Sequence, residues 1–134
     1  MTNAVLGKQL IISVNNKVGT LAEVSQVISS SGINLIAVCA YAVDNKGVIM
    51  FVSEDNKTAK KLLKAKDYDV REEEIVLLTV DNKPGSFQAV TQRVAAAGID
   101  LTLIYGSVEQ KGKTSRIALI SEDNRAVLTA IKTM

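Results

Sequence analysis

Histidine is absent from the sequence, and Cys39 is its only cysteine. Histidine general bases, Cys–His pairs and the usual zinc sites therefore cannot be built from this chain. Cys39 stands in the apolar stretch 35–40, where a free thiol most often serves as a small buried hydrophobic residue. We therefore expect no catalytic residue, no bound metal and no cofactor.

Aromatic residues and unbalanced charge are scarce as well. The three tyrosines and two phenylalanines are scattered, there is no tryptophan, and the formal net charge is only +2. These features exclude the base-stacking platform of a ferredoxin-like RNA binder and a surface for polyanions. Five lysines are interpreted as the solvent-exposed face of one helix and the residues just after it: Lys57, Lys60, Lys61, Lys64 and Lys66. No nucleic-acid partner is expected.

Long hydrophobic runs are also missing. No apolar run approaches the roughly 20 residues of a membrane span, and residues 1–6 are too short and uncharged for a secretory signal. A hydrophobic content of 47% with 22% charged residues is typical of a globular protein. We expect a cytoplasmic protein with no membrane partner.

Internal repetition is the most informative feature that the sequence does contain. Residues 14–19, Val-Asn-Asn-Lys-Val-Gly, return as residues 80–85, Val-Asp-Asn-Lys-Pro-Gly, at an offset of 66. Ser-Glu-Asp-Asn occurs at 53–56 and again at 121–124, an offset of 68. The second copy has therefore gained two residues, as expected at the tip of a hairpin. A period this long lets each copy hold several elements and its own small core.

Each copy begins with a strand followed by an amphipathic helix. Apolar residues alternate along 10–14, as in a half-buried strand, and then recur at helical spacing within 21–28. Both patterns return 66 residues later. Gly32 and Gly98 are predicted to end the helices in the left-handed conformation. The apolar runs that follow at once predict second strands over 33–43 and 99–108.

The rest of each copy predicts a hairpin and a second helix. Turns are expected at 44–47 and 109–113. Each Ser-Glu-Asp-Asn segment is interpreted as a helix-capping turn, with Asp55 and Asp123 as the caps, and not as a catalytic site. Copy one continues into residues 68–72, a candidate fourth strand. We therefore predict an α+β fold of two ferredoxin-like βαββαβ modules, with antiparallel sheets and helices on one face.

The expected modules are residues 1–73 and 74–134, and the second lacks a fourth strand at its C-terminus. Residues 2–6 precede the first strand in the way that residues 68–72 precede the strand at 76–80. Residues 2–6 can therefore complete the second module while residues 68–72 complete the first. The alternative is a frayed N-terminus and a truncated second module.

The loop between the first strand and first helix has two interpretations. In one, residues 15–19 and 81–85 are tight turns, in which glycine permits unusual backbone, Pro84 starts a helix and residues 20–23 form a capping box. In the other, the helix N-terminus attracts a carboxylate and an Asn or Asp oxygen accepts hydrogen bonds from an ammonium group. The second interpretation describes an amino-acid ligand, with its ammonium group near Asn82 or Asp81.

These motifs make the chain resemble the ACT domain family. The signature of this family is a strand, the motif Asp-x-x-Pro-Gly, a helix, the motif Ala-Gly-Ile-Asp-Leu and a second strand. The two motifs are found at 81–101 and, in a related form, at 15–35. The resemblance is to small stand-alone proteins with two such modules and no catalytic domain. It implies an allosteric regulatory module that binds a small ligand, usually an amino acid.

The resemblance also implies where the ligand lies, between the strand-to-helix loop of one module and the start of the second strand of the other. The candidate ligand-binding residues are Asn16, Val18, Gly19, Thr20, Leu21, Asn34, Leu35, Asp81, Asn82, Pro84, Gly85, Ser86, Phe87, Asp100 and Leu101. Copy one departs from the family pattern, because Val18 replaces the proline and Asn15 the acidic residue. Its site is therefore expected to differ from that of copy two.

Two other functions are weighed against amino-acid binding. A regulatory subunit would dock on a metabolic enzyme, as the resemblance to the acetolactate synthase small subunit suggests. A ferredoxin-like enzyme such as an acylphosphatase would need an arginine in its phosphate-binding loop, and neither strand-to-helix loop contains one. The open sheet edges and faces also lead us to expect pairing of whole chains, as a dimer or other homo-oligomer.

Overall fold

A computed structural model describes residues 2–107 and 113–133 and divides the chain into two compact units. The first unit is Lys8–Glu73, and the second unit is Glu74–Met134 together with Met1–Gly7. Two long strands, β1 (Asn3–Asn15) and β4 (Asp69–Asp81), each contribute residues to both units.

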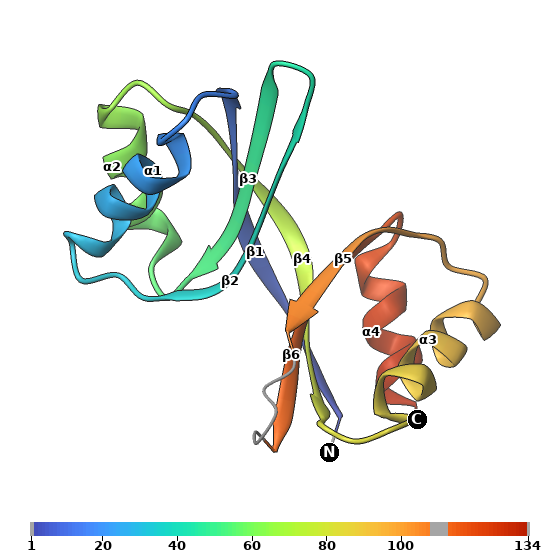
Figure 1. Ribbon diagram of the computed structural model, residues 1–134. Coiled ribbons are helices and arrows are strands. Elements are labelled where there is room, and N and C mark those ends of the chain that lie inside the picture. The colour runs from blue at the N-terminus through green and yellow to red at the C-terminus, as the bar shows by residue number, and fades with distance from the viewer. Residues whose placement is uncertain (1, 108–112, 134) are drawn as a thin grey trace. The chain divides into compact units, whose positions relative to one another are not determined.

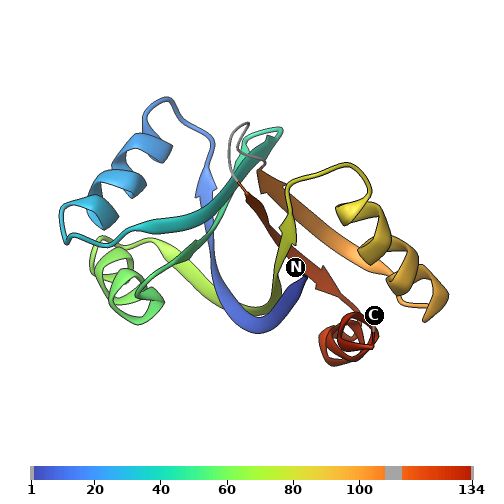
Figure 2. The same cartoon turned by 90° about the horizontal axis from the view of Figure 1, so that it is seen from below.

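The first unit contains the latter part of β1, then α1 (Thr20–Ser29), β2 (Leu35–Val43), β3 (Lys46–Ser53), α2 (Asn56–Ala65) and the start of β4. Strand β3 pairs antiparallel with both β1 and β2. The strand order in this unit is β2-β3-β1-β4. Both helices lie on one face of these strands (Figures 1 and 2).

The second unit repeats this arrangement. It contains the latter part of β4, then α3 (Ser86–Ala96), β5 (Leu101–Ser107), β6 (Thr114–Ser121) and α4 (Asn124–Lys132). Strand β6 pairs antiparallel with β4 and β5, so that the order is β1-β4-β6-β5. Helices α3 and α4 cover one face of the strands (Figure 1). The predicted α+β, ferredoxin-like fold is therefore confirmed.

Each unit has its own hydrophobic core between its helices and strands. The core of the first unit contains Leu10, Ile12, Val24, Ile28, Ile49, Phe51, Ala59, Leu63 and Val70. The core of the second unit contains Ala4, Val76, Leu78, Val80, Val90, Val94, Leu119, Val127 and Ile131. Most of these residues correspond at the offsets of 66 or 68, so the repeated sequence pattern specifies a repeated core.

The N-terminal residues group with the second unit, whereas the expected module boundaries placed them in the first. Ala4 is 7% exposed and packs in the second core, at the position that Val70 occupies in the first. A Cβ on Gly7 would lie 2.9 Å from Leu77 Cδ1, so the strand passes close to β4. We propose that residues 2–6 act as the fourth strand of the second unit, which these contacts support.

The Ser-Glu-Asp-Asn turns have the predicted capping role. The side chain of Asp55 accepts a hydrogen bond from the backbone N–H of Thr58 at 3.1 Å, and hydrogen bonding with Thr58 lowers the pKa of Asp55. Asp123 caps α4 in the same way. The neighbouring Asn56 accepts from the Ser53 N–H and donates to the carbonyl oxygen of Lys8. The motif therefore fastens each second helix to the strands.

Three local predictions need correction, and a fourth falls almost wholly outside the described residues. Residues 20–23 do not form a capping box, because Gly19 is the N-cap of α1 and no side chain caps it. Pro84 precedes the N-cap Gly85 and is not the first helical residue. Cys39 is partly exposed and not buried, because β2 is an edge strand. The predicted turn at 109–113 lies almost wholly outside the described residues.

Candidate functional site

The strand-to-helix loops of the two units have the same backbone geometry. Gly19 and Gly85 have φ angles of 91° and 88°, in the left-handed region that favours glycine. The backbone N–H of Asn16 donates to the Asn45 carbonyl at 2.7 Å, and that of Asn82 donates to the Lys113 carbonyl at 2.9 Å. Each loop is thus held against the hairpin of its own unit.

The helices that follow these loops begin without a side-chain cap. No side-chain hydrogen bond caps α1 or α3, whereas aspartate caps α2 and α4. The first turn of an α-helix carries N–H groups without intrahelical partners, and it favours negative charge. The uncapped ends of α1 and α3 are therefore suited to receive an anionic group such as a carboxylate.

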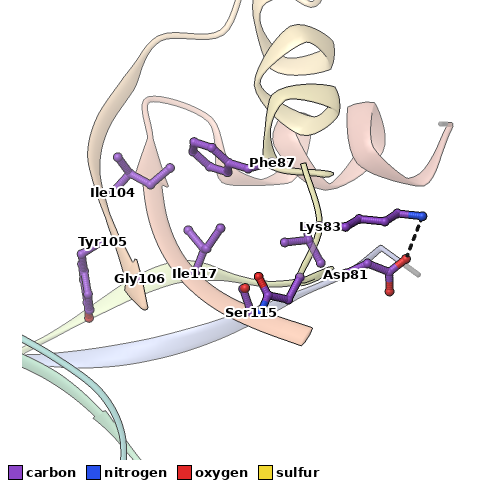
Figure 3. Close-up of a pocket in the computed structure, with 10 residues that line it drawn as sticks. Asp81, Lys83, Phe87, Ile104, Tyr105, Gly106, Ser115 and Ile117 are labelled. Carbon is purple, nitrogen blue, oxygen red and sulfur yellow. Dashed lines mark ion pairs between the residues drawn. The ribbon is translucent and has the colours of Figure 1, made fainter. Parts of the chain in front are cut away.

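A pocket of about 350 Å³ lies beside the N-terminus of α3 in the second unit. It is lined by Val80, Asp81, Asn82, Lys83, Phe87, Ile104, Tyr105, Gly106, Ser115 and Ile117. The side chains of Phe87, Ile104 and Ile117 gather around it in Figure 3. Its size is near the lower end of the roughly 300–1,000 Å³ of small-molecule pockets, which suits a single amino acid.

Charged and aromatic groups stand at the margin of this pocket. The Lys83 ammonium lies 4.0 Å from the Asp81 carboxylate, and Figure 3 shows this ion pair away from the apolar side chains. Tyr105 also points away from Phe87 and Ile104 (Figure 3), as expected for the alternate position on β5. The interior is therefore formed mainly by aliphatic and phenyl groups.

Ser115 is the polar side chain buried at the pocket. It is 4% exposed and lies next to Ile117 on the same side of β6 (Figure 3). Its hydroxyl makes no hydrogen bond to any residue that the structure describes. The hydroxyl oxygen keeps some exposure to the pocket, because no described side-chain nitrogen or oxygen is both fully buried and unpartnered. The hydroxyl is therefore positioned to bond a ligand or a water molecule in the pocket.

The first unit has a corresponding pocket of about 390 Å³ with a different lining. Leu21 takes the place of Phe87, Ala40 that of Gly106, and Gly47 that of Ser115. The first pocket therefore retains an apolar character but has no counterpart of the serine hydroxyl.

The structure brings some of the predicted site residues together and separates others. In the second unit, Asp81, Asn82 and Phe87 line the pocket, and Pro84, Gly85 and Ser86 connect them without lining it. In the first unit, Asn16, Gly19, Thr20 and Leu21 line the corresponding pocket. Val18 does not, because its side chain is fully exposed.

The residues at the start of β2 and β5 do not line the pocket of their own unit. Asp100 and Leu101 follow the C-terminus of α3, whose 11 residues span about 16 Å, whereas the pocket lies at its N-terminus. Asn34 and Leu35 have the same place after α1. Within each unit these residues are therefore separated from the loop of that unit, whereas the family pattern combines them with the loop of the other module.

Seven pocket residues were not among the predicted site residues: Val80, Lys83, Tyr105 and four that alternate along β5 and β6, namely Ile104, Gly106, Ser115 and Ile117. The alternation of these four could have placed them on the helix-facing side. A lone glycine within a strand, such as Gly106, also marks a close approach of backbones. A Cβ there would lie 2.7 Å from the Arg116 carbonyl oxygen.

Neither a metal site nor a membrane-spanning helix is found in the part of the chain that the structure describes. Among those residues, no three His, Cys, Asp or Glu side chains are grouped so that they could hold a metal ion. None of the helices seen there has the length and apolar character needed to cross a membrane.

The duplicated units, each with a ferredoxin-like order and a glycine-ended loop before the first helix, define the class of paired ferredoxin-like domains. The model of the ACT domain pair matches residues 5–128, and the chain belongs to this family. No curated protein matches the sequence.

Solved structures agree with this fold. A protein from Bacteroides thetaiotaomicron has a TM-score of 0.89 and 25% identity, over 97% of this chain and 89% of that one. The regulatory subunit of aspartate kinase from Thermus thermophilus has a TM-score of 0.69 and 15% identity, over 98% and 96%. The corresponding subunit from Thermus flavus has a TM-score of 0.66 and 16% identity, over 98% and 95%.

Proposed function

We propose that the protein is a non-catalytic regulatory module that binds an amino acid at the pocket of the second unit. The observation that carries this proposal is the combination of an uncapped helix N-terminus and the hydroxyl of a buried serine residue around one apolar pocket. A carboxylate suits the helix end, and an ammonium group suits the side-chain oxygens of Asn82 and Asp81. Membership of the ACT domain pair family supports a regulatory role.

No step of catalysis is part of this proposal. The sequence has no histidine, and neither strand-to-helix loop contains arginine. The described residues around the pocket offer one carboxylate, Asp81, which is paired with Lys83. General acid–base work requires a titratable group in reach of the reacting atoms. A turnover of amino acid or acyl phosphate by the pure protein, lost on mutation of a named residue, would contradict this part.

Isothermal titration calorimetry with the twenty amino acids tests the proposed function. Asn82→Ala is expected to weaken binding roughly tenfold, about 1.4 kcal/mol, because one polar contact with the ligand is lost. Gln92→Ala, which removes an exposed amide from α3, is the matched control and should leave the affinity unchanged. Unchanged affinity in Asn82→Ala would place the site elsewhere.

A specific observation favours docking as a second candidate function. Val18, Tyr41 and Val43 of the first unit are 107%, 51% and 62% exposed. Strand β2 ends the strand order of this unit, so one of its edges has no neighbour among the described strands. An exposed apolar edge strand can pair with another chain. The occupant would be a second copy, which gives a homo-oligomer, or a metabolic enzyme.

Light scattering at micromolar concentration separates these possibilities. A second copy on β2 predicts a dimer that Val43→Lys converts to a monomer, because an edge lysine opposes strand pairing. Copurification with an enzyme whose feedback inhibition changes would identify a docking subunit. A strict monomer that alters no enzyme would refute the docking function and leave amino-acid binding as the only candidate.

A further inference from the structure

One end of the pocket in the second unit is apolar, and the other is polar. Phe87 and Ile104 are 43% and 40% exposed, so they form the walls near the opening, and Ile117 lies between them and Ser115 (Figure 3). Val80, 2% exposed, lies opposite Ser115 on the paired strand. A ligand anchored at the loop and at Ser115 would therefore extend toward apolar groups.

The apolar end of the pocket determines which ligand side chain it favours. Burial of a Val, Leu, Ile or Phe side chain makes the free energy of binding more favourable. A polar side chain loses its hydrogen bonds to water on burial, and this weakens binding unless the pocket supplies hydrogen bonds in their place. The walls formed by Phe87, Ile104 and Ile117 supply none. Resting on the proposed amino-acid site, we propose that the second unit selects an amino acid with an apolar side chain, branched aliphatic or aromatic, and that the first unit does not bind it.

Ser115 lies at the polar end of the pocket. The hydroxyl of Ser115 is accessible from the pocket, and a ligand that offers a hydrogen bond there gains a polar contact. The carboxylate or ammonium group of an amino acid can do so while its neighbouring groups contact the loop at Asn82. The polar end thus fixes the orientation of the ligand and directs its side chain toward Ile104 and Phe87.

The first unit lacks this anchor for a steric reason. Gly47 stands at the position of Ser115, and a Cβ on Gly47 would lie 3.0 Å from Cγ2 of Val14. A serine there would have to displace Val14 from the pocket. The loop of the first unit also has Asn15 in place of Asp81, so an ammonium group would meet a neutral amide instead of a carboxylate. Both differences disfavour binding to the first unit of the zwitterionic ligand proposed for the second unit.

A calorimetric panel of four amino acids tests the selectivity. The affinities of L-leucine and L-phenylalanine are expected to be at least roughly tenfold higher than that of L-alanine, because the larger side chain buries more apolar surface. L-Aspartate is expected to bind more weakly than L-alanine. Equal affinities across the panel would leave the proposed function standing and overturn the selectivity. If none of the twenty amino acids binds, the proposed function itself fails.

Matched variants test which unit binds. Ile104→Ser should weaken L-leucine binding roughly tenfold, whereas Val38→Ser, at the equivalent exposed position of the first unit, should not change it. Ser115→Gly, which copies the first unit, should also weaken binding, and circular dichroism must show that each variant is folded. Equal losses in Ile104→Ser and Val38→Ser, or a folded Ser115→Gly with unchanged affinity, would overturn the assignment to the second unit.

Discussion

The pockets of the two units differ in side chains and not in backbone. Both loops turn at a left-handed glycine, both donate a backbone hydrogen bond to a hairpin, and both lead into an uncapped helix. Yet the second pocket has the hydroxyl of a buried serine residue, Ser115, where the first has Gly47. The duplicated units therefore share the backbone of the candidate site, while the side chains proposed to recognise a zwitterion differ at a few positions.

The largest expected effect concerns the strand that borders the second pocket. Gly106→Val should lower the free energy of unfolding by about 1–3 kcal/mol, because its Cβ would meet the backbone of β6. Ala40→Val, at the equivalent position of the first unit, already has room for a Cβ and should cost less. Urea unfolding followed by circular dichroism measures both. Equal costs would mean that the two hairpins are packed alike.

Helix capping gives the next largest difference. Asp123→Ala should lower the free energy of unfolding by about 1 kcal/mol, because Asp123 accepts a hydrogen bond from the Ala126 N–H at the start of α4. Ser86→Ala should cost only a few tenths of a kcal/mol, because no side chain caps α3. Thermal unfolding of both variants decides this comparison. A larger cost for Ser86→Ala would show that α3 is capped after all, and would remove the vacant helix end from the proposed site.

The smallest effect at neutral pH is expected at Tyr68 of the first unit. Burial, together with a hydrogen bond to Glu23, raises the pKa of Tyr68 from 10.0 to about 12. Because the folded state holds the phenol proton more tightly, its stabilising contribution is complete below pH 10. It is lost as the pH rises to about 12. The second unit has Thr2 at the equivalent position and should not show this loss.

Urea unfolding at several values between pH 9 and pH 12 measures this contribution. Tyr68→Phe should remove the alkaline loss that is specific to the phenol, since the variant keeps the ring in the core but cannot ionise. Identical alkaline profiles for the parent protein and Tyr68→Phe would show that the phenol ionises equally well in the folded and unfolded chains.

Much of the fold follows from the sequence because the repeated features act locally. Alternating residues form strands, Asp55 and Asp123 cap helices, and Gly32 and Gly98 take the left-handed conformation with φ of 72° and 71°. The exact extents of β1 and β4 were not predictable in this way. Each is a single strand of 13 residues, because both of its parts continue in extended conformation without a turn residue.

The candidate site was predictable only in part. The loop and Phe87 belong to a contiguous motif, so their approach to one another follows from the turn alone. Ile104, Ser115 and Ile117 come from two other strands, and their places depend on the register that pairs Gly106 with Ile117. Asp100 and Leu101 lie at the other end of α3 from this pocket, and the family pattern combines them with the loop of the other module, so their role stays a prediction.

Amide chemical shifts during titration with L-leucine test the central claim most directly, because they report on both units in one experiment. We expect concentration-dependent shifts at residues 82–87, 104–106 and 115–117, and no comparable shifts at residues 16–21, 38–40 and 47–49. Matching shifts at both sets of residues, or shifts confined to the first unit, would contradict the claim that the second unit alone holds the ligand.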